Sequence, residues 1–506
     1  MGALKAVFTR LPHFYWIQAR SVHWKSGRRG IAIMSEANGS PTSSSHDLSV
    51  PSAVRGMVDL DKNLFQKLVS FPVIPVGARE VGRLRGCTNK YVIKNLGRNI
   101  KPVMNTEDNE KKLLVFNPAA VKDDTVKEEV LSTVREITDD PLKEFEEHSF
   151  SVGFDDWDLK TIFKAVLPDG LEYSSFTQTG HLIHCNFRDD LVPYRKIIGQ
   201  ILLEKVQSCK TVVYKPDLIT TKFRTFQVEL IAGEPNYVVE TTEDGIRYKM
   251  DFTKVFWNSR LSHEHSRILK FITEQSLVFD ACAGIGPFVL PAAKKRNARL
   301  VWGNDLNPDS VHWMKENIRL NKIPEGHVRV FNEDAVEFIR GPVAEYLRDQ
   351  KALPSEERPD AAHFIMNLPA LAVTFLPAFR GMLRMETETS VSGEEPFPVI
   401  VYCYLFAKAQ EDVPATWYAE KAASMARQQL RCDDVQIRRT HEVRTVSNRK
   451  VMFCVECVLP WSLLYAEPLS EEEEKERIEE LSVDQEEDKE DEEVPPTKKR
   501  KDCGDN

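Results

Sequence analysis

The chain lacks the features of several protein classes. None of its 506 residues falls in an apolar stretch approaching the roughly 20 residues that a membrane-spanning helix needs. Its nine cysteines are scattered, and only Cys454 and Cys457 form a C-x-x-C, with no second Cys or His pair at ligand spacing. That pair lies in an alternating apolar run, in which positions three apart point to opposite faces of a strand. We therefore expect no membrane association and no metal, and we favour buried reduced thiols over structural zinc.

A strongly basic body is also missing. Residues 467–494 hold 16 acidic and 3 basic side chains, and residues 1–35 hold six Lys or Arg and no acid. Residues 495–506 carry +2, so of the net charge of −9 only −4 belongs to residues 36–466. The body is therefore not a globally basic nucleic-acid binder, and any contact with a polyanion must come from local patches.

The two ends of the chain carry targeting patterns. Residues 1–35 are cationic, apolar, aromatic and free of acid, which is typical of a mitochondrial transit peptide, with a disordered basic arm as the alternative. Initiation at Met34 would delete that signal, so we expect a mitochondrial matrix pool and a cytoplasmic pool. Residues 466–506 predict a disordered acidic tail, whose basic terminus PPTKKRKD could direct a nuclear pool.

Composition and periodicity divide the rest of the chain. The Ser/Pro-rich residues 36–58 predict a linker, followed by a small unit over 59–140 and a mixed α+β unit over 145–250. Residues 251–465 alternate apolar runs with helical stretches, which predicts an α/β domain with a mostly parallel sheet. Its two last runs, PVIVYCYLF and KVMFCVECVLP, indicate a terminal antiparallel addition.

The small unit contains one dense basic segment. Its seven cations face a single acid, Glu80, and lie among Gly-rich turns and Tyr91. Such a segment suits contacts with phosphates, although a merely solvated basic face explains it almost as well. The cations are Arg79, Arg83, Arg85, Lys90, Lys94, Arg98 and Lys101.

A nucleotide-type cofactor site is indicated by DACAGIGPF, residues 280–288. A buried strand runs into Gly284 and Gly286, whose lack of a side chain lets the backbone turn sharply against a ligand. Asp280 ends that strand, and Asp305 in NDLNP ends the next, where a carboxylate can accept hydrogen bonds from ribose hydroxyls. Asp334 follows a further strand and is placed to approach an adenine.

Two cofactors fit this pattern, S-adenosylmethionine and NAD. The dinucleotide fingerprint requires a third glycine where this chain has Val289, and it needs no motif like NLPA, residues 367–370. In NLPA, Asn367 offers both a carbonyl acceptor and an amide donor at a strand end, and Pro369 fixes the turn that presents them. The pattern favours S-adenosylmethionine over NAD as the cofactor. It also favours an acceptor site at NLPA over a simple strand-to-loop turn.

With these motifs the chain resembles the archaeal and eukaryotic tRNA (guanine-37, N1)-methyltransferase family over residues 59–465. The resemblance implies a small domain that checks the outer corner of tRNA, a middle domain, and a class I, Rossmann-like methyltransferase domain acting on the anticodon loop. It also implies a role in reading-frame maintenance and in supplying the precursor of wybutosine-type modification; we expect a monomer. The matching stretches are FPVIPVGAREVGRL, GHLIHCNFRDDLVPYRKIIG, TKFRTFQVELIAGE, DFTKVFWNSRLSHEHSRI, DACAGIGPF, NDLNP and NLPA.

The resemblance implies three catalytic roles. Arg224 of T-K-F-R matches the family's catalytic arginine, Glu264 of R-L-S-H-E its general base, and Asn367 the residue that orients the guanine. Cofactor contacts are expected from ten residues: His263, Asp280, Gly284, Gly286, Asp305, Leu306, Asp334, Ala335, Asn367 and Pro369.

The chemistry of guanine supports those roles. N1 carries a proton at neutral pH, and a carboxylate within hydrogen-bond reach can remove it, a step typically worth about 10²–10⁴-fold. Negative charge then develops on O6, where an arginine stabilises the transition state more than the ground state. The alternatives are a surface Arg224, and a Glu264 that forms an i,i+3 ion pair with Arg267 on a helix.

Other functions share parts of the pattern. Aminocarboxypropyl transferases of the wybutosine pathway use the same cofactor, but their counterpart of NLPA is longer and lacks that form. A non-catalytic RNA-binding homologue need not keep Arg224, Glu264, Asp305 and Asn367 together. A protein or DNA amino-methyltransferase would carry an aromatic residue where this chain has Ala370.

Overall fold

The computed structural model describes residues 47–479, except 95, 97–99, 109, 216–227, 386–394 and 448. Contacts divide the chain into Met1–Asp47 and Leu48–Asn506, and the elements described below all belong to the second unit. The expected transit peptide, most of the acidic tail, and Arg224 lie outside the described residues. None of the helices in the described part of the chain combines the length and apolar composition needed to cross a bilayer.

The first sheet is antiparallel, with strand order β2-β3-β1-β4. Strand β4 follows the predicted boundary at 140–145 but pairs with β1, so this sheet continues past that boundary to Val152. The elements are η1 (Ser52–Val54), η2 (Lys62–Phe65), β1 (Lys67–Gly77), α1 (Val81–Thr88), β2 (Val103–Asn105), β3 (Lys111–Val115), α2 (Asp124–Thr138) and β4 (Glu146–Val152).

The second sheet has the order β5-β6-β7-β8, and its central pair β6–β7 is parallel. The strand and amphipathic helix predicted over 180–205 are β6 and α4, and α4 buries its apolar side against β7 and β8. The elements are η3 (Phe154–Asp156), α3 (Leu159–Val166), β5 (Phe176–Thr179), β6 (Leu182–Cys185), η4 (Val192–Tyr194), α4 (Arg195–Lys205), β7 (Thr211–Tyr214) and β8 (Glu229–Gly233).

The third sheet has seven strands in the order β13-β12-β11-β14-β15-β17-β16. Its first five strands are parallel, and their near-continuous apolar sequences reflect burial on both faces. The strands are β11 (Leu277–Asp280), β12 (Leu300–Asn304), β13 (Val328–Phe331), β14 (Ala362–Met366), β15 (Val399–Lys408), β16 (Gln436–Ser447) and β17 (Lys450–Leu459). The predicted mostly parallel α/β sheet is confirmed.

The antiparallel addition differs from the prediction in one respect. The run PVIVYCYLF is β15, which is parallel to β14, so the addition begins only with β17 and β16. Strand β16 was not expected because its sequence QIRRTHEVRTVS is polar, as suits an edge strand with an exposed face.

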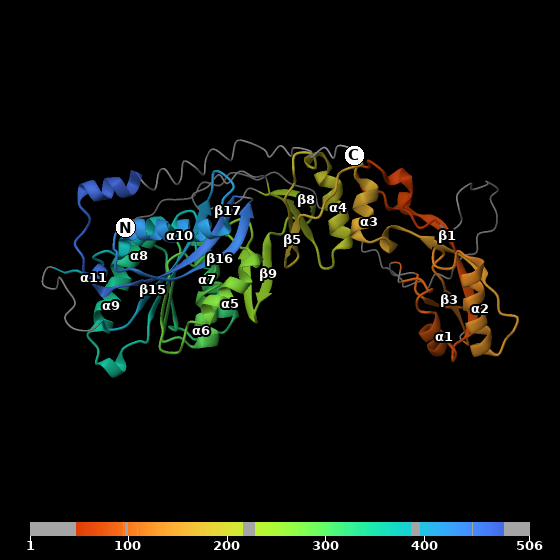
Figure 1. Ribbon diagram of the computed structural model, residues 1–506, viewed down its shortest axis with the longest axis horizontal. Helices are drawn as coiled ribbons and strands as arrows, with labels where there is room; N and C mark the ends of the chain where they lie inside the picture. The colour runs from red at the N-terminus through yellow and green to blue at the C-terminus, as the bar shows by residue number, and fades with distance from the viewer. Residues whose placement is uncertain are drawn as a thin grey trace, which may run out of the picture. The chain divides into compact units, whose positions relative to one another are not determined.

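Helices cover both faces of this sheet (Figure 1). One core lies under α8 (Ala335–Phe338), η6 (Ile339–Val343), α9 (Ala344–Lys351), η8 (Ala372–Phe379), α10 (Ala415–Leu430) and α11 (Trp461–Leu464). The other lies under the hairpin β9 (Val238–Glu243) and β10 (Ile246–Asp251), with α5 (Ser262–Leu269), α6 (Val289–Arg296) and α7 (Pro308–Leu320). Two short 3-10 helices, η5 (Ser259–Leu261) and η7 (Ser355–Glu357), lie between these elements. Residues 471–479, in the described part of the tail that was expected to be disordered, are helical.

The cysteine pair shows how β17 separates these two cores. Cys457 packs in the first core and Cys454 in the second, and both thiols are fully buried and free. The prediction that the two residues point to opposite faces is confirmed.

Candidate active site

Three parallel strands end beside one another at the edge where the predicted cofactor residues lie. Asp280 is the last residue of β11, Asp305 directly follows β12, and Asp334 is the N-cap of α8 after β13. Ligands of open α/β sheets bind at this carboxyl edge. The predicted positions of the three carboxylates relative to the strand ends are therefore confirmed.

The glycine turn after β11 has the backbone that the motif predicts. Gly284 and Gly286 have φ of +54° and +95°, conformations that other residues adopt only with strain. A Cβ on Gly286 would lie 2.1 Å from Leu290 Cδ1, whereas a Cβ on Gly284 would meet nothing within 4 Å. A side chain at Gly286 would therefore force Leu290 to move, while Gly284 leaves open space beside the turn.

Asp280 is a buried carboxylate with an unused acceptor. Its Oδ1 accepts a hydrogen bond from the Cys282 amide at 3.2 Å, while Oδ2 is buried and has no partner in the described structure. Burial, and to a smaller extent the charge of Asp305, raises the pKa of Asp280 well above its usual value. A cationic ammonium group would satisfy Oδ2 and reverse this effect, so the residue fits the amino-acid end of S-adenosylmethionine.

The other two carboxylates already accept hydrogen bonds from backbone amides. Asp305 accepts hydrogen bonds from the amides of Gly284 at 2.7 Å and Asn307 at 2.9 Å, one on each oxygen. Asp334 accepts from the Val336 amide at 2.9 Å. Each ionised oxygen has two lone pairs, so Asp305 can still accept a ribose hydroxyl, but it also ties the glycine turn to β12.

The remaining expected cofactor residues differ in exposure. His263 on α5 is exposed, and Leu306 is 37% exposed after β12. Ala335 is buried at the start of α8, and Pro369 is half-buried after β14. Among the described residues, no group of three His, Cys, Asp or Glu side chains is arranged to hold a metal ion.

The sheet register brings Asn367 close to the second half of the site. Met366 on β14 pairs with Cys403 on β15, so Asn367 and Tyr404 follow at neighbouring positions. Asn367 is half-buried, and its side chain forms no hydrogen bond to the described part of the protein. Its amide is therefore available to an acceptor base at this edge.

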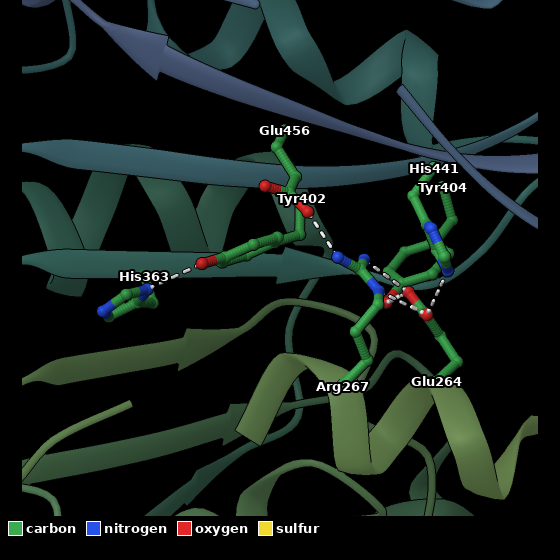
Figure 2. Close-up of polar contacts among 7 residues, drawn as sticks. All are labelled: Glu264, Arg267, His363, Tyr402, Tyr404, His441 and Glu456. Atoms are coloured by element: carbon green, nitrogen blue, oxygen red, sulfur yellow. Dashed lines mark hydrogen bonds and ion pairs between the residues drawn. The ribbon is translucent and has the colours of Figure 1, made fainter. Parts of the chain in front are cut away.

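Glu264 is buried beneath this edge, on α5, with its side chain only 4% exposed. Figure 2 shows the side chains that converge on its carboxylate. Oε1 accepts from Tyr404 Oη at 2.7 Å and from Arg267 Nη2 at 2.8 Å. Oε2 accepts from Arg267 Nε at 2.7 Å and lies 3.5 Å from His441 Nε2.

Arg267 joins two buried carboxylates. Besides its two bonds to Glu264, its Nη1 donates to Glu456 on β17, whose side chain is 3% exposed (Figure 2). The i,i+3 pair considered from the sequence is thus present, but it lies in the protein interior rather than on a helix surface. A buried pair of this kind must be complete, because an uncompensated charge there is costly.

Three residues of this cluster were not assigned from the sequence: Tyr404, Glu456 and His441. Tyr404 on β15 pairs with Cys454 on β17, and Cys454 pairs with His441 on β16, so the three form a row across adjacent strands. One signal was available, since Glu456 is the only charged residue inside the apolar run VMFCVECVLP. A lone carboxylate in a buried strand indicates a buried partner.

The surroundings of Glu264 favour its ionised form. Burial is the largest influence and acts to raise its pKa, but the hydrogen bonds from Arg267 and Tyr404 and the charge of Arg267 together outweigh it. The pKa of Glu264 is therefore lowered, and the carboxylate is ionised at neutral pH. The expected catalytic Arg224 lies outside the described residues, so its position relative to Glu264 is not described.

Family models match two parts of the chain. The TRM5/TYW2 methyltransferase domain matches residues 239–388, and the TYW2 N-terminal domain matches residues 159–236. The boundary between the matches falls before β9, in agreement with the packing of the β9–β10 hairpin on the large sheet.

Whole-chain comparisons extend this result. A tRNA (guanine(37)-N(1))-methyltransferase of Caenorhabditis elegans is 47% identical over 442 residues, which are 84% of this chain and 93% of that protein. The Mus musculus enzyme of the same name is 34% identical over 91% of this chain and 88% of its own.

A solved complex of aTrm5 and tRNALeu covers 77% of this chain and all of its own, with 20% identity and a TM-score of 0.53, which shows a shared fold. The two sequence matches cover 84% and 91% of this chain at 47% and 34% identity, so they show the family as well as the fold. The chain belongs to the tRNA (guanine(37)-N(1))-methyltransferase family.

Proposed function

We propose that this protein transfers a methyl group from S-adenosylmethionine to N1 of guanosine 37 in tRNA, with Glu264 as the general base. The observation that carries the proposal is the buried, ionised Glu264 carboxylate, which Tyr404 links to the strand edge that bears Asn367. The position on the acceptor follows from the name of the relatives, which are up to 47% identical to this chain.

Glu264 supplies what the acceptor chemistry needs. Guanine N1 becomes a nucleophile only when its proton leaves, and an ionised carboxylate can accept that proton. Because three of the four contacts to Glu264 are short and buried, its carboxylate is fixed in one orientation. Fixed orientation lowers the entropic cost of reaching a productive geometry.

Two other residues are proposed to act on the guanine: one orients it, and the other stabilises the negative charge that it develops. Asn367 can donate and accept hydrogen bonds at the guanine edge, which would orient N1. Arg224 is proposed to stabilise the negative charge that develops on O6 as the proton leaves. The target guanine must leave its stack to reach this edge of the sheet. Unstacking a flipped nucleotide costs on the order of a few kcal/mol.

The glycine turn and Asp280 are proposed to bind the cofactor. When bound, the cofactor supplies an activated methyl group on a sulfonium. Asp280 Oδ2 would accept from its ammonium group, and the space beside Gly284 would let the cofactor lie against the backbone. Asp305 would keep the turn in place and retains lone pairs for a ribose hydroxyl.

The first sheet is proposed to contact tRNA through its basic segment. Lys90 is exposed; it forms a 3.3 Å ion pair with Glu129 and lies over the Tyr91 ring. An exposed pair of this kind is weak and exchanges readily with a phosphate. A lower dependence of tRNA binding on salt in a Lys90→Ala variant would support this contact.

The proposed function is tested with tRNA transcripts that differ only at position 37. The full chain should add a single methyl group to the G37 transcript and nothing to an A37 transcript, with 1-methylguanosine as the product nucleoside. Mass analysis separates this result from aminocarboxypropyl transfer, which adds a larger group. Transfer to the A37 transcript, or a larger added group, would reject the proposal.

We further propose that residues 1–34 direct a mitochondrial pool, as their composition indicates. A reporter fused to these residues should enter mitochondria, whereas a chain begun at Met34 should not. A reporter that stays outside would reject this proposal without affecting the proposed activity.

A further inference from the structure

The carboxylate of Glu264 has three short contacts with largely buried side chains and one longer contact with a partly exposed side chain. Arg267 and Tyr404, which make its three short contacts, are buried or nearly so, with Arg267 13% exposed. The fourth neighbour, His441, is 37% exposed and lies at the longer distance of 3.5 Å from Oε2 (Figure 2). Among the described neighbours of Glu264, His441 is therefore the one that connects the carboxylate to solvent.

The buried cluster is built to accept one additional proton. Two carboxylates, Glu264 and Glu456, share the single guanidinium of Arg267, so the three charges sum to −1. When Glu264 takes up a proton, Glu456 still neutralises Arg267. Protonation of Glu264 therefore leaves the Arg267–Glu456 pair neutral, with no uncompensated charge in the interior.

A base that has accepted a proton must lose it before the next turnover. Arg267 has no acceptor atom and cannot take it. Tyr404 is fully buried and already donates its hydroxyl hydrogen to Glu264. Cys454, which lies between Tyr404 and His441 in the strand row, is also fully buried and gives no route to solvent.

We propose that His441 takes the proton from Glu264 and releases it to solvent, and this inference rests on the proposed function. The N1–H bond of guanine breaks as the Oε2–H bond of Glu264 forms. The Oε2–H bond then breaks as a bond from the proton to Nε2 of His441 forms. The resulting imidazolium releases its Nδ1 proton to water, which leaves ionised Glu264 and a neutral histidine that carries its proton on Nε2. Proton exchange with water then returns the Nδ1–H tautomer, whose Nε2 can accept again.

The charges around His441 suit this role. Burial lowers the pKa of His441 most, and the charges of Arg267 and of Arg439 on its own strand lower it further. The charges of Glu264 and Glu456 raise the pKa, but the net direction is downward. His441 is therefore neutral at physiological pH, and in the tautomer that carries its proton on Nδ1 it can accept a proton at Nε2. The groups facing it are Glu264 and Arg267 from α5, Tyr404 from β15, Cys454 and Glu456 from β17, and Arg439 from β16.

A purely structural role for His441 makes a different prediction. If the imidazole only supports the orientation of Glu264, a side chain of similar shape that cannot titrate should replace it. A free imidazole in solution would then have no effect on the rate. Proton transfer instead depends on the basicity of the acceptor, so added imidazoles should restore turnover.

The test uses the full chain, a G37 transcript and S-adenosylmethionine. His441→Ala should retain one methyl transfer per enzyme, because Glu264 can still accept the first proton. Its steady-state turnover should fall roughly 10²-fold and should recover with added imidazole. His441→Gln, which keeps the shape and a hydrogen-bond donor, should be equally slow in steady state. The exposed His312 on α7 provides the matched control, and His312→Ala should behave as wild type.

The outcomes separate this inference from the proposed function. Steady-state turnover of His441→Ala equal to wild type, or no response to imidazole, would overturn the role of His441. Glu264→Gln serves as the reference, and it should lose the first methyl transfer as well. A Glu264→Gln enzyme with a wild-type first turnover would remove Glu264 as the base, and with it the proposed mechanism, whatever His441 does.

Discussion

Arg267 binds Glu264 through two parallel hydrogen bonds, Nε to Oε2 at 2.7 Å and Nη2 to Oε1 at 2.8 Å. The remaining Nη1 donates to Glu456, 189 residues away in the sequence. This geometry fixes the orientation of Glu264 and keeps the carboxylate ionised although it is buried. The same arginine therefore accounts for the stability of the cluster and for the basicity of the proposed base.

Replacing Arg267 by Met should remove both effects. Without the guanidinium, burial dominates and the pKa of Glu264 rises, so the acid limb of the single-turnover pH–rate profile should move to higher pH. The wild-type limb lies below the usual glutamate value, because its pKa is lowered. Loss of one partner of a buried pair should also reduce the free energy of unfolding by about 3 kcal/mol.

Arg319 on α7 offers a matched control for Arg267. It also forms an i,i+3 pair, with Glu316, but its side chain is 72% exposed. Arg319→Met should change the free energy of unfolding by less than about 1 kcal/mol and leave the pH–rate profile in place. If Arg267→Met keeps the wild-type acid limb, Arg267 does not control the ionisation of Glu264.

Local pattern was enough to predict the cofactor edge of the site. The strand ends at Asp280 and Asp305, the glycine turn, and the strand before Asn367 all follow from residues adjacent in the sequence. The Glu264 cluster could not be predicted in this way. Its contacts with Tyr404 and Glu456 span 140 and 189 residues, and they depend on the register of β15, β17 and β16.

The polar edge strand was missed for a related reason. A strand that is exposed on one face shows no continuous apolar run, and β16 also contains register shifts that break its alternation. The position of His441 depends on those shifts and on its pairing with Cys454, so it could be found only in the structure.

The two glycines of the cofactor turn should respond differently to alanine. In Gly286→Ala the new Cβ collides with Leu290, so this variant should lose about 1–3 kcal/mol from overpacking, in addition to backbone strain. Gly284→Ala carries only the left-handed strain of about 1–2 kcal/mol, because nothing lies within 4 Å of its Cβ. Chemical denaturation without cofactor measures the difference. Equal losses would show that the turn relaxes around Leu290.

Asp280→Asn should stabilise the cofactor-free protein and weaken cofactor binding. The unfolded carboxyl ionises above about pH 3.8, whereas the folded one, with a raised pKa, resists ionisation. Its contribution to stability is therefore present at low pH and is lost as pH rises. At pH 7 the variant should melt higher than wild type without S-adenosylmethionine and gain less from adding it. A larger gain than wild type would contradict the proposed contact.

His363 should make the protein sensitive to mild acid. Burial lowers the pKa of this histidine from 6.5 to about 4, and its Nδ1 lies 3.1 Å from Tyr402 Oη. The unfolded chain takes up a proton first, so stability is full above about pH 6.5 and falls as pH drops toward 4. The loss between pH 7 and pH 5 should be about 2 kcal/mol.

Denaturation at the two pH values checks this slope. His363→Gln should flatten it by about that amount, while the exposed His312→Gln should leave it unchanged. Part of the slope should remain in either variant, because burial also lowers the pKa of His184 to about 4. A slope that is unchanged in His363→Gln would show that another group controls the acid response.

In the proposed reaction Glu264 removes the N1 proton of guanosine 37. Single-turnover methylation of a G37 transcript by the full chain, wild type against Glu264→Gln, measures this step. We predict 1-methylguanosine as the product and a rate about 10²–10⁴-fold lower in the variant, with equal binding of S-adenosylmethionine. Equal rates across pH, or methylation at another atom of the base, would contradict it.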